Sequence, residues 1–291
     1  MLRFDQATKG KQMPGMRSSW TRVVPVLAVA ALLLVACGNT KSTAGGSGAV
    51  DQKTTAAPTP LRILVTNDDG FDAKGIDAVV EALRALPDTQ VTVVAPKTNQ
   101  SGTDGKTTPG PLTVTDVKTL SGYPAKAVGG YPADTIIWAL DQHGIDFTPD
   151  LVVSGINFGQ NIGQLVKISG TVGAARAAAA RGVPALAASQ GLGDPVDFPA
   201  GVKQVLSWLS SQRPSLTNGS ATSPVLLQNL NTPSCATGSV RGLVDVSIST
   251  GPADADLGQS DCNSTATDKT DDVVAFTEGF ATLSPLPLTD S

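Results

Sequence analysis

Two stretches of the sequence decide the fold: Leu61–Gly70 (LRILVTNDDG) and Pro149–Ala175 (PDLVVSGINFGQNIGQLVKISGTVGAA). The first begins with a near-continuous apolar run, Leu61–Thr66, which is typical of a parallel strand covered on both faces. The second predicts another buried strand, a loop rich in asparagine and glycine, and the start of a helix. In an open α/β sheet, ligands bind outside the carboxyl ends of the strands. The sequence therefore predicts a binding site where these two strands end.

Strands and helices alternate along the rest of the chain. Apolar residues at helical spacing predict a helix at Ala73–Leu86, and Gln90–Ala95 follows it as a second strand. This order predicts a parallel sheet with right-handed crossovers. We expect a hairpin within residues 112–128. Further expected helices are Pro132–His143, Thr171–Arg181 and Phe198–Gln212, and further strands are Leu151–Ser154, Val183–Ala188 and Val225–Leu230.

The pattern weakens after Thr232 into loops and short strands, and the last expected strand lies within Gly279–Leu288. Residues 61–291 are long enough for one large α/β domain with an appendage. We place the core of that domain at residues 61–190 and its C-terminal part at residues 191–291.

The first sixty residues do not have the pattern of a folded domain. Val23–Ala36 is an uncharged run after a basic start, too short to span a bilayer but typical of a secretory signal. The end of this run, Leu34–Cys37, resembles the lipobox of bacterial lipoproteins, in which the cysteine is lipidated. An ordinary cleaved signal is the alternative. We expect residues 1–36 to be a signal, residues 37–60 to be a disordered tether, and the protein to be lipid-anchored outside the cytoplasm.

Charge and cysteine content narrow the possible partners. Residues 1–36 hold five of the 21 basic residues but one of the 25 acidic ones, so the mature chain is more acidic than the formal net charge of −4 suggests. Such a surface argues against binding a nucleic acid polymer, which requires Lys and Arg. Beyond Cys37 the chain has two cysteines, Cys235 and Cys262. Outside the cytoplasm, such a pair favours a disulfide over a metal site.

Polar side chains follow three of the expected strands. Asp68 and Asp69 come directly after the first strand, Ser101 after the second, and Asn157 after Leu151–Ser154. Adjacent carboxylates repel each other unless a cation or hydrogen-bond donors offset their charge. A surface turn is the alternative, because Asn-Asp-Asp-Gly is also turn chemistry. Together the four side chains form an all-oxygen set suited to Mg²⁺ or Mn²⁺.

Ser169-Gly170-Thr171 precedes an Ala-rich run with high helix propensity. A Ser or Thr at this place is first of all an N-cap, and the free N–H groups of the same helix end attract phosphate. The sequence has no phosphate loop of the G-x-x-x-x-G-K-[ST] type and no G-x-S-x-G nucleophile elbow. Its single histidine, His143, is expected on the surface, which argues against a histidine-based mechanism.

The motifs NDDG, APKTNQSG, GGYPAD, PDLVVSGINFGQNIG and SGTVGAA occur in the order and spacing of the SurE family, which this chain resembles over Leu61–Ser189. The resemblance continues weakly through Gln228–Pro233 and Glu278–Leu286. It implies a Rossmann-like, three-layer α/β domain with a mostly parallel sheet and a β-rich C-terminal extension that helps to form a homodimer or tetramer. SurE proteins are metal-dependent phosphatases that act on nucleoside 5′-monophosphates, sometimes also on 3′-nucleotides or polyphosphate.

The resemblance also assigns roles to individual residues. It implies that Asp68, Asp69, Ser101 and Asn157 are the metal ligands, and that Asn161 and the turn Ser169-Gly170-Thr171 lie near the phosphate. The family usually has an acidic residue and a Tyr between Gly163 and Ser169, where this chain has Gln164–Ile168. Recognition of base or sugar is therefore expected to differ, and Lys167 is a candidate contact for an anionic substrate.

The leading hypothesis is a 5′-nucleotidase (a phosphoric monoester hydrolase) in which a metal-activated water attacks the phosphate, with Asp68 or Asp69 as a possible proton acceptor. One alternative is a lipid-anchored protein that binds a nucleotide or phosphate without turnover. Another is a phosphatase of a different phosphate ester or of polyphosphate.

Overall fold

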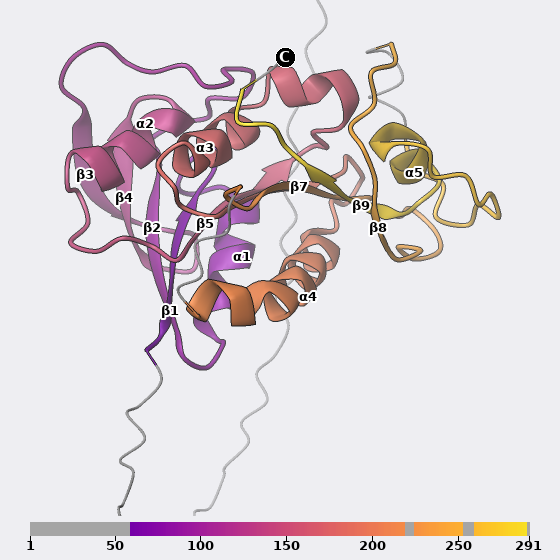
Figure 1. The fold of residues 1–291 in the computed structure, drawn as a ribbon, viewed down its shortest axis with the longest axis horizontal. Coiled ribbons are helices and arrows are strands. Elements are labelled where there is room, and N and C mark those ends of the chain that lie inside the picture. Colours follow the sequence, from indigo (N-terminus) through magenta and orange to yellow (C-terminus); the bar gives the residue numbers. More distant parts are fainter. Residues whose placement is uncertain (1–58, 219–223, 253–258, 290–291) are drawn as a thin grey trace, which may run out of the picture. The chain divides into compact units, whose positions relative to one another are not determined.

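The computed structural model of the chain describes residues 59–218, 224–252 and 259–289. Within these ranges a nine-stranded sheet has the order β3-β4-β2-β1-β5-β6-β7-β9-β8 (Figure 1). Strands β4, β2, β1, β5, β6 and β7 are parallel to their neighbours in this series, whereas β3 and β9 run antiparallel to β4 and β7. The strands are β1 (Leu61–Thr66), β2 (Thr89–Pro96), β3 (Thr113–Lys118), β4 (Pro124–Gly129), β5 (Leu151–Phe158), β6 (Ala185–Gln190), β7 (Leu227–Thr232), β8 (Leu243–Asp245) and β9 (Ala281–Pro285).

Helices cover both faces of the sheet and make a three-layer arrangement. On one face lie α1 (Lys74–Arg84) and α4 (Phe198–Thr217), and on the other α2 (Pro132–Ile136) and α3 (Gly170–Ala179) (Figure 1). Successive residues of β1 point to opposite faces, as in any strand. Ile63 therefore packs in the core under α1 and α4, while Leu64 packs in the core under α3. The Rossmann-like α/β fold expected from the sequence is confirmed.

The direction of winding reverses beside β1. The chain passes from β1 to β2 and β4 on one side, and then crosses back to β5, β6 and β7 on the other. β1 and β5 are consequently neighbours, with Thr66 opposite Ser154 at the last paired position. Such a reversal opens a crevice outside the carboxyl ends of the two strands, where ligands of doubly wound folds bind.

β5 is longer than the sequence predicts. The expected strand Leu151–Ser154 continues to Phe158, so Asn157 lies within the strand, opposite Ser189 of β6, and not in a loop after it. The register shifts between Ser154 and Asn157. Gly155 lies in this irregularity with a φ of +141°, and a Cβ there would lie 2.2 Å from the Ala188 carbonyl oxygen. A glycine is therefore required, and its presence is what ended the strand too early in the prediction.

Other element boundaries also differ from the prediction. The helix expected at Pro132–His143 is α2 followed by a π-helical turn, η1 (Ile137–Asp141), and His143 is exposed just beyond it. A further helix, α5 (Asp272–Thr277), was not expected; the Asp271 side chain caps it by accepting hydrogen bonds from the Val273 and Val274 amides. A helix of six residues is shorter than two turns and has too few residues to show a period in the sequence.

None of the helices in the described ranges is both long enough and apolar enough to cross a bilayer. The predicted signal (residues 1–36), Cys37 and most of the predicted tether lie outside the described residues.

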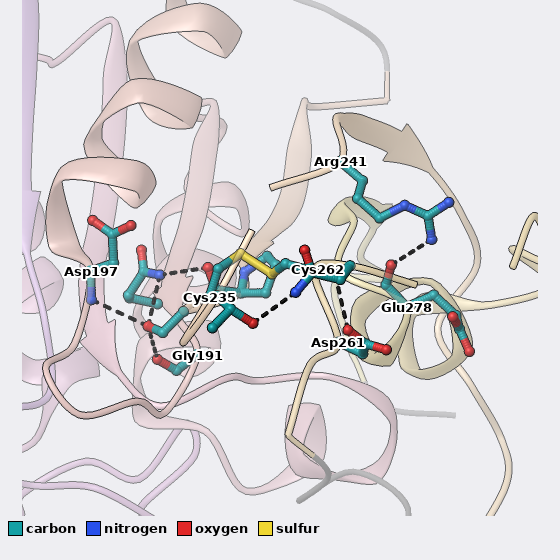
Figure 2. The surroundings of a disulfide bond; sticks show 12 residues. Gly191, Asp197, Cys235, Arg241, Asp261, Cys262 and Glu278 are labelled. Atoms are coloured by element: carbon teal, nitrogen blue, oxygen red, sulfur yellow. Dashed lines mark hydrogen bonds between the residues drawn. A yellow bond between two sulfur atoms is a disulfide. The ribbon is translucent and has the colours of Figure 1, made fainter. Parts of the chain in front are cut away.

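A disulfide joins Cys235 to Cys262 in the C-terminal part of the chain (Figure 2). The Cα atoms of the two cysteines are 5.6 Å apart, an ordinary separation for a disulfide. On one side of the bond, the hydroxyl of Ser234 donates to the Gly191 carbonyl and accepts from the Asp197 amide. The bridge therefore fastens the segment that follows β7 to the segment that leads into α5.

Reducing this disulfide is expected to lower the free energy of unfolding by about 3.5 kcal/mol, the loop-closure entropy for a sequence separation of 27. Urea unfolding with and without reductant measures the effect. A Cys235→Ala/Cys262→Ala variant is the control and should not respond to reductant. Equal stability of the wild-type protein in both conditions would contradict the expectation.

Candidate active site

The turn after β1 presents two carboxylates at the point where the winding reverses. Asn67 closes this turn: its Nδ2 donates to the Gly70 carbonyl at 2.8 Å, and its Oδ1 accepts from the Gly70 amide at 3.3 Å. Asn-Asp-Asp-Gly is therefore a turn, and the same turn can also present a pair of metal-binding carboxylates. Asp68 is 2% exposed, whereas Asp69 is only partly buried.

Asp68 lies against the first turn of α3. The hydroxyl of Thr171 donates to Asp68 Oδ1 at 2.6 Å. Gly170 lies directly beside the same carboxylate, because a Cβ at that position would be 2.9 Å from the Asp68 Cβ. The start of the helix, with its partial positive charge, thus supports a carboxylate of the chain itself.

Asp69 is held by two other segments. Its Oδ1 accepts from Asn99 Nδ2 at 3.1 Å, and its Oδ2 accepts from the Phe158 amide at 2.9 Å. Asn99 also accepts a hydrogen bond from the Ser101 amide at 3.0 Å, so it links two of the predicted metal ligands. The sequence analysis did not select Asn99. The available signal was its spacing, since an asparagine two residues before a loop residue commonly bonds that residue's backbone.

Burial raises the pKa of both carboxyls. For Asp68, burial outweighs the hydrogen bonds from Thr171 that lower the pKa. For Asp69, burial is again the largest cause; the Phe158 amide lowers the pKa and the charge of Asp68 raises it, and the result is about 6. Among the described residues, no ion pair reaches either carboxylate. A cation at this position would remove the cost that burial imposes on two adjacent negative charges.

A pocket of about 200 Å³ opens beside Asp68. Its lining includes Ser101, Asn157, Asn161 and Ser169, so five of the eight residues expected around the metal and phosphate meet there. Asn157 donates from Nδ2 to the Gly159 carbonyl at 2.7 Å, which leaves its Oδ1 as the atom able to coordinate. Carboxylate, hydroxyl and amide oxygens fit a hard cation such as Mg²⁺ or Mn²⁺. The described ranges hold no group of three or more His, Cys, Asp or Glu residues that could bind a metal, so neutral oxygens such as those of Ser101 and Asn157 would have to complete the coordination.

A larger cavity, of about 620 Å³, lies where β5 and β6 begin. Asp141, His143 and Arg181 are among the residues that line it, and none of the predicted site residues is. The chemistry of the polar residues, and not cavity size, therefore identifies the candidate site.

The loop after β5 is fixed by side chains far away in the sequence. The Asn161 amide donates to Asn231 Oδ1 at 2.7 Å, the Asn161 side chain donates to Ser189 Oγ at 2.9 Å, and Asn229 donates to the Asn161 carbonyl at 2.7 Å. Asp272, fully buried at the start of α5, accepts from the Gly163 amide at 3.0 Å. The C-terminal part of the chain therefore holds the loop in which Asn161 lies.

The residues of the turn Ser169-Gly170-Thr171 lie in two different environments. Ser169 is the N-cap of α3, accepting from the Val172 amide at 3.2 Å, and it also lines the pocket. Gly170 and Thr171 are buried beside Asp68 and do not line the pocket. Their position makes them supports for a carboxylate, whereas the sequence analysis placed them near phosphate.

Gln164–Lys167 form most of a 3-10 helix, η2 (Gly163–Lys167), and Ile168 follows as its C-cap residue. Leu165 and Ile168 line the pocket, but Lys167 is exposed and does not. The side of the pocket formed by η2 is therefore apolar, and the predicted contact between Lys167 and an anionic substrate gains no support.

Thr171→Val is expected to weaken Mn²⁺ binding by about 10- to 100-fold, the usual cost of losing an outer partner of a metal ligand. The variant removes the hydroxyl that stabilises ionised Asp68. Thr171→Ser, which keeps the hydroxyl, is the matched control. Titration calorimetry measures both affinities, and equal weakening in the two variants would show that the hydroxyl is not responsible.

The metal-free protein is expected to lose stability as the pH rises toward about 6. Folding raises the pKa of Asp69 from 3.8 to about 6, so within this window the folded state binds more protons than the unfolded state. Asp69→Asn removes the carboxyl whose titration causes this loss of stability. Urea unfolding in EDTA at several pH values should therefore show that the variant gains stability over wild type as the pH increases. A constant difference between the two proteins would be inconsistent with a raised pKa.

Comparisons with known proteins identify the family of the chain. A family model described as "Survival protein SurE" matches residues 63–251. Proteins named "5'-nucleotidase SurE" from Methanopyrus kandleri and Vibrio campbellii are 44% and 46% identical to the chain over 135 and 133 residues. These matches cover 46% and 45% of this chain, and 50% and 48% of the two relatives. The chain thus spans about half the length of the curated relatives it matches.

A solved structure of the SurE protein from Aquifex aeolicus has the same fold, with a TM-score of 0.61 at 25% sequence identity. The superposition covers 79% of this chain and 94% of that one. The family match includes both strand ends that carry the carboxylates and Asn157. The chain belongs to the SurE family.

Proposed function

We propose that this protein is a metal-dependent phosphomonoesterase that hydrolyses nucleoside 5′-monophosphates to nucleoside and phosphate. One observation carries the proposal: two adjacent carboxylates, the buried Asp68 and the partly buried Asp69, lie at the switch point of the sheet without a cationic partner among the described residues. Ser101 and Asn157 add neutral oxygens at the pocket that Asp68 lines. The relatives that are similar over this region carry the name 5′-nucleotidase.

Asp68, Asp69, Ser101 and Asn157 would hold the metal. A divalent cation bound there lowers the pKa of water and offsets the charge of the phosphoryl group. The residues of the chain itself supply position: Thr171 orients Asp68, and Asn99 orients Asp69. Asn161, which lines the pocket and is held from β6 and β7, would contact the phosphate.

The same proposal includes a location and an assembly. The signal-like residues 1–36 would direct export, Cys37 would carry the lipid, and residues 37–60 would span roughly 25–30 Å as a flexible tether. Outside the cytoplasm the enzyme would release phosphate and nucleosides for uptake. We further propose that the folded part forms a homodimer or tetramer.

The direct experiment measures phosphate released from nucleoside 5′-monophosphates by the purified protein with Mg²⁺ or Mn²⁺. Activity is expected with metal and should be lost in EDTA. Loss of a residue that only supports a metal ligand can cost roughly 100-fold. Asp68→Ala, which removes a ligand itself, should therefore lower activity by more than that. Asp116→Ala is the matched control, since Asp116 is an exposed aspartate of β3.

Activity that survives both EDTA and Asp68→Ala would refute the proposal. Tight nucleotide binding without phosphate release would instead favour a binding protein that uses the same pocket. A panel that includes polyphosphate and other phosphate esters distinguishes a phosphatase of different specificity.

A further inference from the structure

Apolar side chains gather around the mouth of the candidate active site. Phe158, Ile168 and Leu192 are 55%, 55% and 47% exposed, and all three line the pocket that contains Asp68 and Asn157. The described ranges hold five large hydrophobic side chains that are at least 47% exposed, and three of the five surround one small pocket. Single exposed apolar residues are common, but a cluster beside a polar cavity marks a binding surface. We call Phe158, Ile168 and Leu192 the apolar rim.

The apolar rim is joined to the polar floor of the pocket by the backbone. Phe158 follows the predicted ligand Asn157, and its amide donates to Asp69. Ile168 precedes Ser169, the N-cap of α3. The Leu192 amide donates to Gln160 Oε1 at 3.1 Å, and the Leu192 side chain lies against Gly159, where a Cβ would be 3.5 Å from Leu192 Cδ2. The backbone from which the rim side chains extend is therefore tied to the residues of the pocket.

We infer that the apolar rim binds the nucleobase of the substrate by contact with its flat face while the phosphate lies at the Asp68 end of the pocket. This inference rests on the proposed function. Phe158 is the only aromatic side chain of the lining, and a base stacks on an aromatic ring whatever its identity. The side chains of the rim carry no hydrogen-bonding group. They therefore select for the apolar area of the base and not for the hydrogen-bonding groups at its edge. Purine nucleotides consequently bind more tightly than pyrimidine nucleotides, and sugar phosphates without a base bind most weakly.

The kinetic test compares adenosine 5′-monophosphate with ribose 5-phosphate, which lacks the base. Base–aromatic stacking contributes enough that Phe158→Ala should raise KM for the nucleotide by roughly 5- to 100-fold, and by much more than KM for ribose 5-phosphate. Phe158→Trp keeps an aromatic face and should retain the preference. Leu120→Ala, which removes another exposed apolar side chain far along the sequence, is the matched control and should leave the ratio of the two KM values unchanged.

A binding measurement separates this inference from turnover. In EDTA, saturation-transfer NMR with adenosine 5′-monophosphate should show stronger transfer to the base protons than to the ribose protons, and Phe158→Ala should abolish the difference. Strong base transfer without any phosphate release would reject the proposed function and leave the inference standing. Equal transfer to base and ribose, or an equal rise of both KM values in Phe158→Ala, would overturn it. A change of oligomeric state in Phe158→Ala would also overturn the inference, because the apolar rim would then be a contact between chains.

Discussion

The burial of two consecutive carboxylates at the end of β1 is the constraint on which the rest of the site depends. Asp68 and Asp69 repel each other, and burial raises the pKa of both, so their position costs folding free energy. Folded proteins retain such costs mainly at functional sites. Neighbouring groups offset part of it: Thr171 donates to one carboxylate, and Asn99 and the Phe158 amide donate to the other. These partners are all hydrogen-bond donors without charge, and a hard cation is the group that would satisfy the remaining negative charge.

The C-terminal part of the chain contributes to the site by holding it in place. Asn231 of β7 and Asp272 of α5 fix the loop after β5, although they lie 70 and 109 residues from their partners Asn161 and Gly163. The Cys235–Cys262 disulfide fastens the segments that lead from one of these elements to the other (Figure 2). Residues beyond residue 190 therefore support a loop of the site whose predicted metal ligands all lie before it.

The sequence predicted the elements whose signals are local and periodic. β1 matches its expected bounds, because an apolar run bounded by a turn is unambiguous. The strand at Leu151 was predicted too short, because Gly155 and a register shift interrupt its pattern, and this placed Asn157 in a loop. Among the site residues, Asp68 and Asn157 follow from their position at strand ends. Thr171 and Asn99 could not be assigned their roles from sequence, since which donor meets which carboxylate is decided by packing between distant segments.

The most direct test of the account is anomalous diffraction from crystals soaked in Mn²⁺. The account predicts one strong peak per chain in the described fold, with side-chain oxygens of Asp68, Asp69 and Asn157 at about 2 Å, the distance of oxygen ligands to a small divalent cation. A peak at another place, or none near the carboxylate pair at saturating Mn²⁺, would contradict it.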